Sequence, residues 1–242
     1  MRISIFLQVL FLLILPWNFS DAQDAKIIVF LIPGQGADAR QFQRLELNPD
    51  YEIRNIEYFT PEKGWKMKDF AQALSQQIDT TAKYVIIGVS LGGMLATEMG
   101  EFLHPEKIIL ISSAKCRDEL PGRYTFQKTI PINKLVPPGM IKGGAKLLQP
   151  MVERDSKKDR RVFLDMLNDK DPLFLKRTVA MIIQWGRDEY RNDIVHIHGD
   201  NDHTLPSKNV EYNYLIENGS HMMVYTRAEE ISALVNKILL MK

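Results

Sequence analysis

Residues 88–93, Gly-Val-Ser-Leu-Gly-Gly, constrain the fold of this chain more than any other stretch. They follow an apolar run at 84–87 that is typical of a buried parallel strand. They precede residues 94–99, which contain neither proline nor glycine and favour a helix. A serine between glycines in a strand-to-helix turn has a strained backbone, and its oxygen is exposed beside the helix N-terminus. The stretch predicts a nucleophilic Ser90, the alternative being a solvated serine in an ordinary glycine-rich turn.

Buried apolar runs alternate with helix-like segments along most of the chain. This alternation predicts an α/β fold with a mostly parallel sheet that is flanked by helices on both faces. The expected strands are 26–32, 51–59, 84–87, 107–113, 194–199 and 212–216, and the expected helices are 37–42, 67–78, 94–103, 160–168, 173–185 and 228–240.

The alternation is interrupted at about 115–191, where no convincing buried strand occurs. Because the sheet pattern resumes afterwards, we expect this segment to be an inserted helical cap, with prolines and glycines interrupting its early part at 131–144. The segment carries 17 lysines and arginines against 10 aspartates and glutamates, most densely at 154–161. A solvated helix face is the ordinary explanation, and a patch that attracts an anionic substrate or membrane surface is the alternative.

The N-terminus has the pattern of a secretory signal. Met1-Arg2 is basic, residues 3–15 are almost all apolar, and Ser20-Asp21-Ala22 places small residues before a cleavage site. We expect a signal peptide at 1–22, a mature domain at 23–242, and export to the periplasm or the medium. The apolar run is short for a membrane span, so an uncleaved membrane anchor is the less favoured alternative.

The composition excludes some partners. The formal net charge of the 242 residues is only +1, which gives no electrostatic argument for nucleic acid. Cys116 is the single cysteine, so no intramolecular disulfide can form. No glycine-framed turn surrounds Cys116, and we interpret it as a buried or incidental thiol rather than a nucleophile.

Two later strand ends supply partners for Ser90. The strand at 194–199 leads to Asp202, and the strand at 212–216 leads to His221. Because carboxyl ends of parallel strands meet at one edge of a sheet, these side chains can converge there. His221 would take the serine proton, and Asp202 would orient the imidazole. Asp200 and Asp118 compete with Asp202 for the orienting role.

The remaining polar and sulfur-containing side chains have simpler interpretations. His196, His198 and His203 lie near two aspartates, but we expect them to pack around the site, and serine chemistry needs no metal or cofactor. The expected hydrogen-bond donors to an oxyanion are the backbone amides of Leu91 and of the 33–36 loop, where Gln35 is the favoured residue. Four methionines, Met94, Met99, Met222 and Met223, are expected to fill the core and an acyl pocket.

Over residues 26–242 the chain resembles the α/β-hydrolase family in four motifs: Pro33-Gly34-Gln35, Gly88-Val89-Ser90-Leu91-Gly92, Gly199-Asp200-Asn201-Asp202 with Pro206, and Gly219-Ser220-His221. The resemblance implies a Ser90–Asp202–His221 triad and a lid inserted after the strand that ends near Ser113. Two departures stand out. Pro33 replaces the usual histidine of the oxyanion loop, and little chain remains for the family's two N-terminal antiparallel strands.

These features predict a serine hydrolase that acts on a carboxylic ester or thioester with a small-to-medium acyl group. Peptide cleavage, lactone opening and cofactor-free peroxidation occur on similar folds, so the fold alone does not rank them. A non-catalytic protein that binds a small molecule is the alternative of another class.

Overall fold

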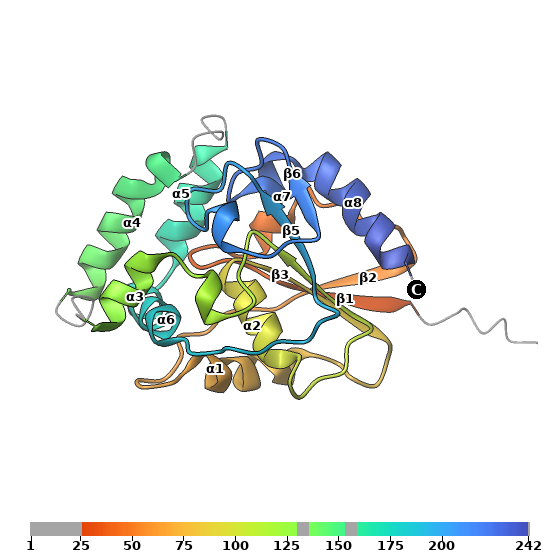
Figure 1. The fold of residues 1–242 in the computed structure, drawn as a ribbon, viewed down its shortest axis with the longest axis horizontal. Coiled ribbons are helices and arrows are strands. Elements are labelled where there is room, and N and C mark those ends of the chain that lie inside the picture. The colour runs from red at the N-terminus through yellow and green to blue at the C-terminus, as the bar shows by residue number, and fades with distance from the viewer. Residues whose placement is uncertain (1–25, 130–135, 153–158, 242) are drawn as a thin grey trace, which may run out of the picture.

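The computed structural model describes residues 26–129, 136–152 and 159–241. A six-stranded sheet forms its centre, with every neighbouring pair of strands parallel and helices on both faces (Figure 1). The predicted α/β architecture is therefore confirmed. In the order β2-β1-β3-β4-β5-β6, the strands are β1 (Ile27–Ile32), β2 (Tyr51–Asn55), β3 (Tyr84–Val89), β4 (Lys107–Ile111), β5 (Val195–Gly199) and β6 (Tyr214–Ile216).

Two helical layers cover the sheet because alternate residues of a strand point to opposite faces. Phe30 and Ile86 face α1 and α2, whereas Val29 and Ile87 face α8, and all four side chains are buried. Both faces of the sheet are thus shielded from water, which explains the near-continuous apolar runs of the central strands. In the described residues, the α-helices outside the cap are α1 (Met67–Leu74), α2 (Leu91–Met99), α7 (Met223–Thr226) and α8 (Ala228–Leu240). Short 3₁₀ helices lie at Ala39–Phe42, Ser75–Gln77 and Ser207–Asn209, and at Arg117–Glu119 in the cap segment.

Several elements end earlier than the sequence pattern predicts. The strand expected at 107–113 stops at Ile111 because Ser112 has a positive φ of 48°, which turns the chain out of the sheet. The helix expected at 67–78 ends as an α-helix at Leu74 and continues as a 3₁₀ turn. The edge strand expected at 51–59 ends at Asn55.

Between β4 and β5 the chain forms α3 (Gly122–Thr129), α4 (Pro138–Val152), α5 (Arg160–Asp169) and α6 (Pro172–Gln184), which gather at one end of the sheet (Figure 1). The expected interruption near Pro138, Gly143 and Gly144 is wrong, since these residues belong to α4. Proline is well tolerated at the first position of a helix, because its missing N–H has no intrahelical partner there. Packing of α4 against α6 and α5 offsets the low helix propensity of the two glycines.

Two predictions fall outside the described residues. The signal peptide expected at 1–22 is one, and the basic residues Arg154, Lys157 and Lys158 of the cap cluster are the other. Within the described ranges, no helix has both the length and the apolar character needed to cross a bilayer.

Candidate active site

Ser90 occupies a strained turn between β3 and α2. Its backbone has φ 52° and ψ −118°, a region that residues with a side chain rarely adopt. The turn is held by its carbonyl oxygen, which accepts hydrogen bonds from the amides of Gly93 and Met94 at 2.9 and 3.1 Å and from Ser113 Oγ at 2.7 Å. A Cβ atom at Gly88 would lie 2.4 Å from the Gly92 carbonyl oxygen, so the turn requires glycine there.

The substitution Gly92→Ala is expected to destabilise the protein by about 1–3 kcal/mol or more, because the new Cβ would lie 2.1 Å from the Ile32 carbonyl oxygen. Thermal unfolding, measured by circular dichroism, should show that the midpoint of Gly92→Ala is several degrees below that of the wild type. Gly143→Ala is the matched control, since nothing lies within 4 Å of its Cβ position in α4. Helix propensity predicts a gain of up to about 1 kcal/mol there. Equal midpoints for both variants would contradict this account of the turn.

The structure brings Ser90, His221 and Asp202 together from loops that follow three different strands. His221 Nε2 lies 2.9 Å from Ser90 Oγ, and His221 Nδ1 lies 2.7 Å from Asp202 Oδ2. The second carboxylate oxygen, Asp202 Oδ1, accepts from the amides of Thr204 and Leu205, each at 2.8 Å. The three side chains therefore form one hydrogen-bonded chain from a hydroxyl to a carboxylate.

Only one of the three candidate carboxylates reaches the imidazole. Asp202 is buried, with 2% of its surface exposed, whereas Asp200 and Asp118 are exposed. Burial raises the pKa of Asp202, but attraction to His221 and hydrogen bonds from His221 and the Leu205 amide outweigh it and hold the pKa below its usual value. Asp202 is therefore an anion at neutral pH, which allows it to orient the ring.

Two backbone amides next to Ser90 have no acceptor within the part of the chain that is described. They are those of Leu91, the first residue of α2, and of Gln35, in the loop after β1. This loop passes close to the serine, since a Cβ atom built at Gly34 would lie 3.4 Å from Ser90 Cβ. Both amides are available to an oxygen atom that binds beside the hydroxyl.

Three side chains that the sequence did not single out hold the 33–36 loop in place. Gln41 Oε1 accepts from the amide of the loop's second residue at 2.8 Å, and the Tyr58 hydroxyl donates to the carbonyl of its first residue at 2.5 Å. From the cap, Thr178 Oγ1 accepts from Gln35 Nε2 at 2.7 Å. No sequence pattern marks these residues, because their partners are backbone groups and residues distant in the chain.

Ser90 and His221 line a cavity of about 390 Å³ between the sheet edge and the cap. Of the four methionines considered above, Met94 and Met222 line it, whereas Met99 and Met223 are buried in the core. The other apolar residues of the lining come mostly from the cap and are Ala37, Tyr124, Ala145, Phe163, Met166, Leu167, Ile182 and Leu205.

Two histidines are buried below the Asp202 loop. His196 Nδ1 lies 2.8 Å from the Glu211 carbonyl oxygen, His198 Nε2 lies 2.7 Å from the Leu205 carbonyl oxygen, and the rings meet edge to face. His203, in contrast, is exposed. Within the described residues, no group of three or more histidines, cysteines or carboxylates is arranged to hold a metal ion. His196 and His198 are both fully buried, and each ring contacts a backbone carbonyl oxygen.

Acid is expected to destabilise the protein through this pair. Burial, and then the neighbouring His198, lower the pKa of His196 to about 3, and burial also lowers that of His198. The unfolded chain binds protons at these residues below about pH 6.5, so the folded state loses stability as the pH falls from there towards 3. For His196 alone the loss at pH 5 is about 2 kcal/mol.

Urea unfolding measured between pH 7.5 and pH 5 would test this dependence. In His196→Asn the group that titrates is absent, so the variant should lose less stability than the wild type over the same interval, whatever its stability at pH 7.5. Parallel curves for the two proteins would contradict a neutral, buried His196.

Cys116 lies in a buried position between β4 and α3. Burial raises the pKa of its thiol, so the group stays protonated and weakly nucleophilic at neutral pH. Cys116 is also not among the residues that line the cavity at Ser90. The structure thus offers no activated thiol at this position.

Comparison with known proteins supports the assignment of the fold. Residues 37–134 match the model of the uncharacterised protein family UPF0227, and no curated protein matches the chain. Among solved structures, an esterase from Thermogutta terrifontis has a TM-score of 0.69 at 14% identity, covering 89% of this chain and 90% of its own. An enol-lactonase from Burkholderia xenovorans LB400 has a TM-score of 0.68 at 12% identity, with 89% and 92% covered.

An esterase from Exiguobacterium antarcticum is similar over the same extent, with a TM-score of 0.62 at 16% identity and 89% and 92% of the chains covered. Identities this low establish the fold and leave the reaction to be argued from the site. In the described residues every pair of neighbouring strands is parallel. With its parallel sheet, its serine turn after the third strand and these structural neighbours, the chain has the α/β-hydrolase fold.

Proposed function

We propose that this protein is a serine hydrolase that cleaves carboxylic esters or thioesters of small-to-medium acyl groups through an acyl-enzyme at Ser90. The observation that carries the proposal is the unbroken chain of hydrogen bonds from Ser90 Oγ through His221 to Asp202, at 2.9 and 2.7 Å. A hydroxyl, an imidazole and an ionised carboxylate in this geometry are what acyl transfer requires.

The proposed reaction begins when Ser90 Oγ attacks the acyl carbonyl carbon while His221 Nε2 takes the hydroxyl proton. Asp202 keeps Nδ1 protonated and stabilises the imidazolium that forms. The carbonyl oxygen becomes an oxyanion, which the amides of Leu91 and Gln35 can bind. His221 then gives its proton to the leaving alcohol or thiol. In the second half of the reaction, water attacks the acyl carbon while His221 takes its proton, and His221 returns a proton to Ser90 Oγ as the acid leaves.

The size and lining of the cavity support the proposed substrate class. About 390 Å³ lies near the lower end of the range of small-molecule sites, and the walls beyond Ser90 are mainly apolar. An acyl chain bound there would stabilise the complex by about 25 cal/mol for each Å² of apolar surface that it buries. We therefore expect kcat/KM with p-nitrophenyl esters to rise from acetyl to a medium chain and to fall for palmitoyl.

The direct test of the proposed function is labelling by a fluorescent fluorophosphonate, which reacts with activated serines. Wild-type protein should label, and heat-denatured protein should not. A folded protein that never labels and hydrolyses no ester in the panel would favour the alternative, a non-catalytic protein that binds a small molecule in the same cavity. Lactones and peptides in the same panel would separate the other reactions that this fold supports.

Export is part of the proposal, and it depends on the sequence of residues 1–22. N-terminal sequencing of the protein recovered after expression in a bacterial host should begin at Gln23 if the signal is cleaved as expected. An intact Met1 start in the membrane fraction would instead favour the uncleaved anchor.

A further inference from the structure

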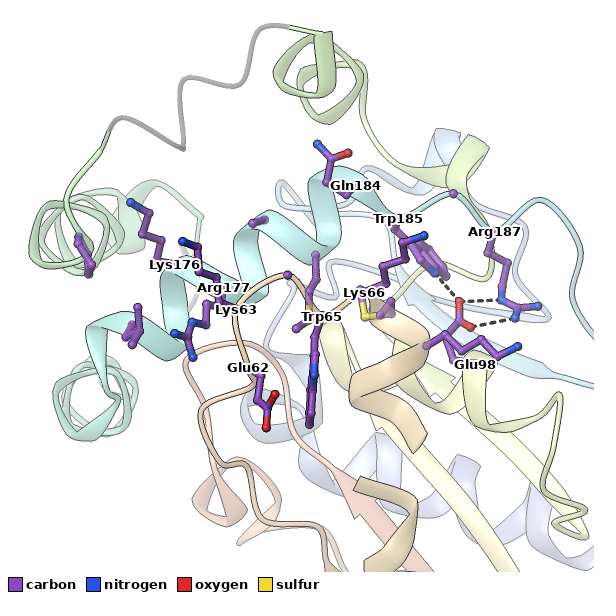
Figure 2. Close-up of a pocket in the computed structure, with 18 residues that line it drawn as sticks. Glu62, Lys63, Trp65, Lys66, Glu98, Lys176, Arg177, Gln184, Trp185 and Arg187 are labelled. Carbon is purple, nitrogen blue, oxygen red and sulfur yellow. Dashed lines mark hydrogen bonds and ion pairs between the residues drawn. The ribbon is translucent and has the colours of Figure 1, made fainter. Parts of the chain in front are cut away.

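A second cavity, of about 880 Å³, lies between residues 62–68 and α6 (Figure 2). We call it the α6 groove. Residues 62–68 belong to the segment that joins β2 to α1 and to the start of that helix. The groove is separate from the Ser90 cavity because α6 forms a wall of both: Met181 lines the groove, whereas Ile182 lines the cavity at Ser90. Nothing in the proposed reaction uses this space.

Positive charge is concentrated in the α6 groove. Lys63, Lys66 and Lys68 come from one wall, and Lys176 and Arg177 come from α6. In the view of Figure 2, Lys63, Lys176 and Arg177 lie on one side of Trp65 and Lys66 lies on the other. Since the whole chain has a net charge of only +1, this concentration is a local feature and not a consequence of a basic protein.

The acidic residues of the lining do not form ion pairs with the three lysines of residues 62–68. Glu98 accepts hydrogen bonds from Trp185 Nε1 at 2.7 Å and from Arg187 Nε at 2.9 Å, so it is already paired with a sixth cation. Glu62 is then the single remaining carboxylate among the described residues of the lining. Across the described part of the chain, no carboxylate lies within 4.0 Å of the ammonium groups of Lys63, Lys66 and Lys68.

The groove also offers apolar surface between its two basic sides. Trp65 is partly exposed and stands between Lys63 and Lys66 (Figure 2). Its ring contacts those of Phe59 and Phe70, whose centroids lie 6.3 and 6.4 Å away. Met67 and Met181 add buried apolar side chains to the lining. A flat ring can therefore bury apolar area against Trp65 while its charged substituents reach the lysines.

We propose that the α6 groove binds a small molecule that carries two or more phosphate groups attached to an aromatic ring, the chemistry of a nucleoside di- or triphosphate. Lysines bind phosphate as point charges, and cations on two opposite sides need more than one anionic group to engage them all. The volume lies within the range of small-molecule sites.

Isothermal titration calorimetry of the full chain at physiological ionic strength, with three probes, would test the proposal. ATP should bind with a stoichiometry near one, tripolyphosphate should bind at least about tenfold more weakly, and adenosine more weakly still. Trp65 fluorescence should be quenched by ATP, as expected for stacking on the partly exposed ring.

Two double variants would show whether ATP binds in the groove. Lys63→Gln with Lys176→Gln should weaken ATP binding at least about tenfold, whereas Lys208→Gln with Lys237→Gln, two exposed lysines outside the groove, should leave it unchanged. No binding of ATP, or equal weakening by the two pairs, would overturn the proposal. Equal affinity for tripolyphosphate and ATP would also overturn it, and so would binding to phosphatidylglycerol vesicles without any binding of ATP.

Discussion

Replacing Ser90 with alanine is expected to lower kcat for a p-nitrophenyl butyrate substrate by on the order of 10⁵-fold or more. The substitution removes the atom that attacks the acyl carbon, and it leaves the turn intact because the hydrogen bonds that hold the turn go to the backbone of this residue. Steady-state kinetics on purified protein, with fluorophosphonate labelling in parallel, would measure the loss.

Two comparisons distinguish a lost nucleophile from a damaged fold. The unfolding midpoint of Ser90→Ala should stay within a few degrees of the wild type, because among the described residues the Ser90 side chain forms a hydrogen bond only with His221. The double variant with His221→Ala should be no less active than either single variant, since residues that act as one unit are not additive. Residual labelling of Ser90→Ala would place the reactive serine elsewhere.

The substitution Asp202→Asn is expected to lower kcat by about 10⁴-fold, with a much smaller effect on KM. A carboxylate accepts a hydrogen bond from His221 Nδ1, at 2.7 Å, and so keeps Nε2 free to take the serine proton. An amide can instead donate to Nδ1, which would leave the ring's proton on Nε2, facing Ser90 Oγ. The variant keeps the shape of the buried side chain while removing its charge.

Asp200→Asn is the matched control for this prediction. Asp200 lies two residues away on the same loop but is exposed, so its variant should keep activity close to that of the wild type. If the two variants lost activity equally, the acidic loop would affect catalysis through its overall charge, and the specific contact between Asp202 and His221 would not matter.

Much of the fold could be predicted from the sequence, because its signals are local. Apolar runs such as 84–87 identify buried strands, and the glycines around Ser90 identify a turn that no larger residue can form. Element ends were less predictable. Ser112 ends β4 through a positive φ that its sequence does not indicate, and Pro138 and Gly143 lie within a helix that tertiary packing stabilises.

The choice among Asp202, Asp200 and Asp118 shows where reasoning from the sequence stops. All three carboxylates follow strand ends, and only the folded chain shows that one of them is buried against His221. The role of Gln41 in holding the 33–36 loop could not be predicted from the sequence, because its partner is a backbone amide whose position depends on the tertiary structure.

By itself the sequence determined the α/β layers, the serine turn and the candidates Ser90 and His221, because periodicity, glycine geometry and chain order are properties of neighbouring residues. Only the tertiary structure decided which carboxylate faces the imidazole, how large the cavity at Ser90 is, and that Lys63 and Lys176 share the α6 groove. These properties depend on distances between residues far apart in the chain, and those distances are set only when the sheet and the cap pack together.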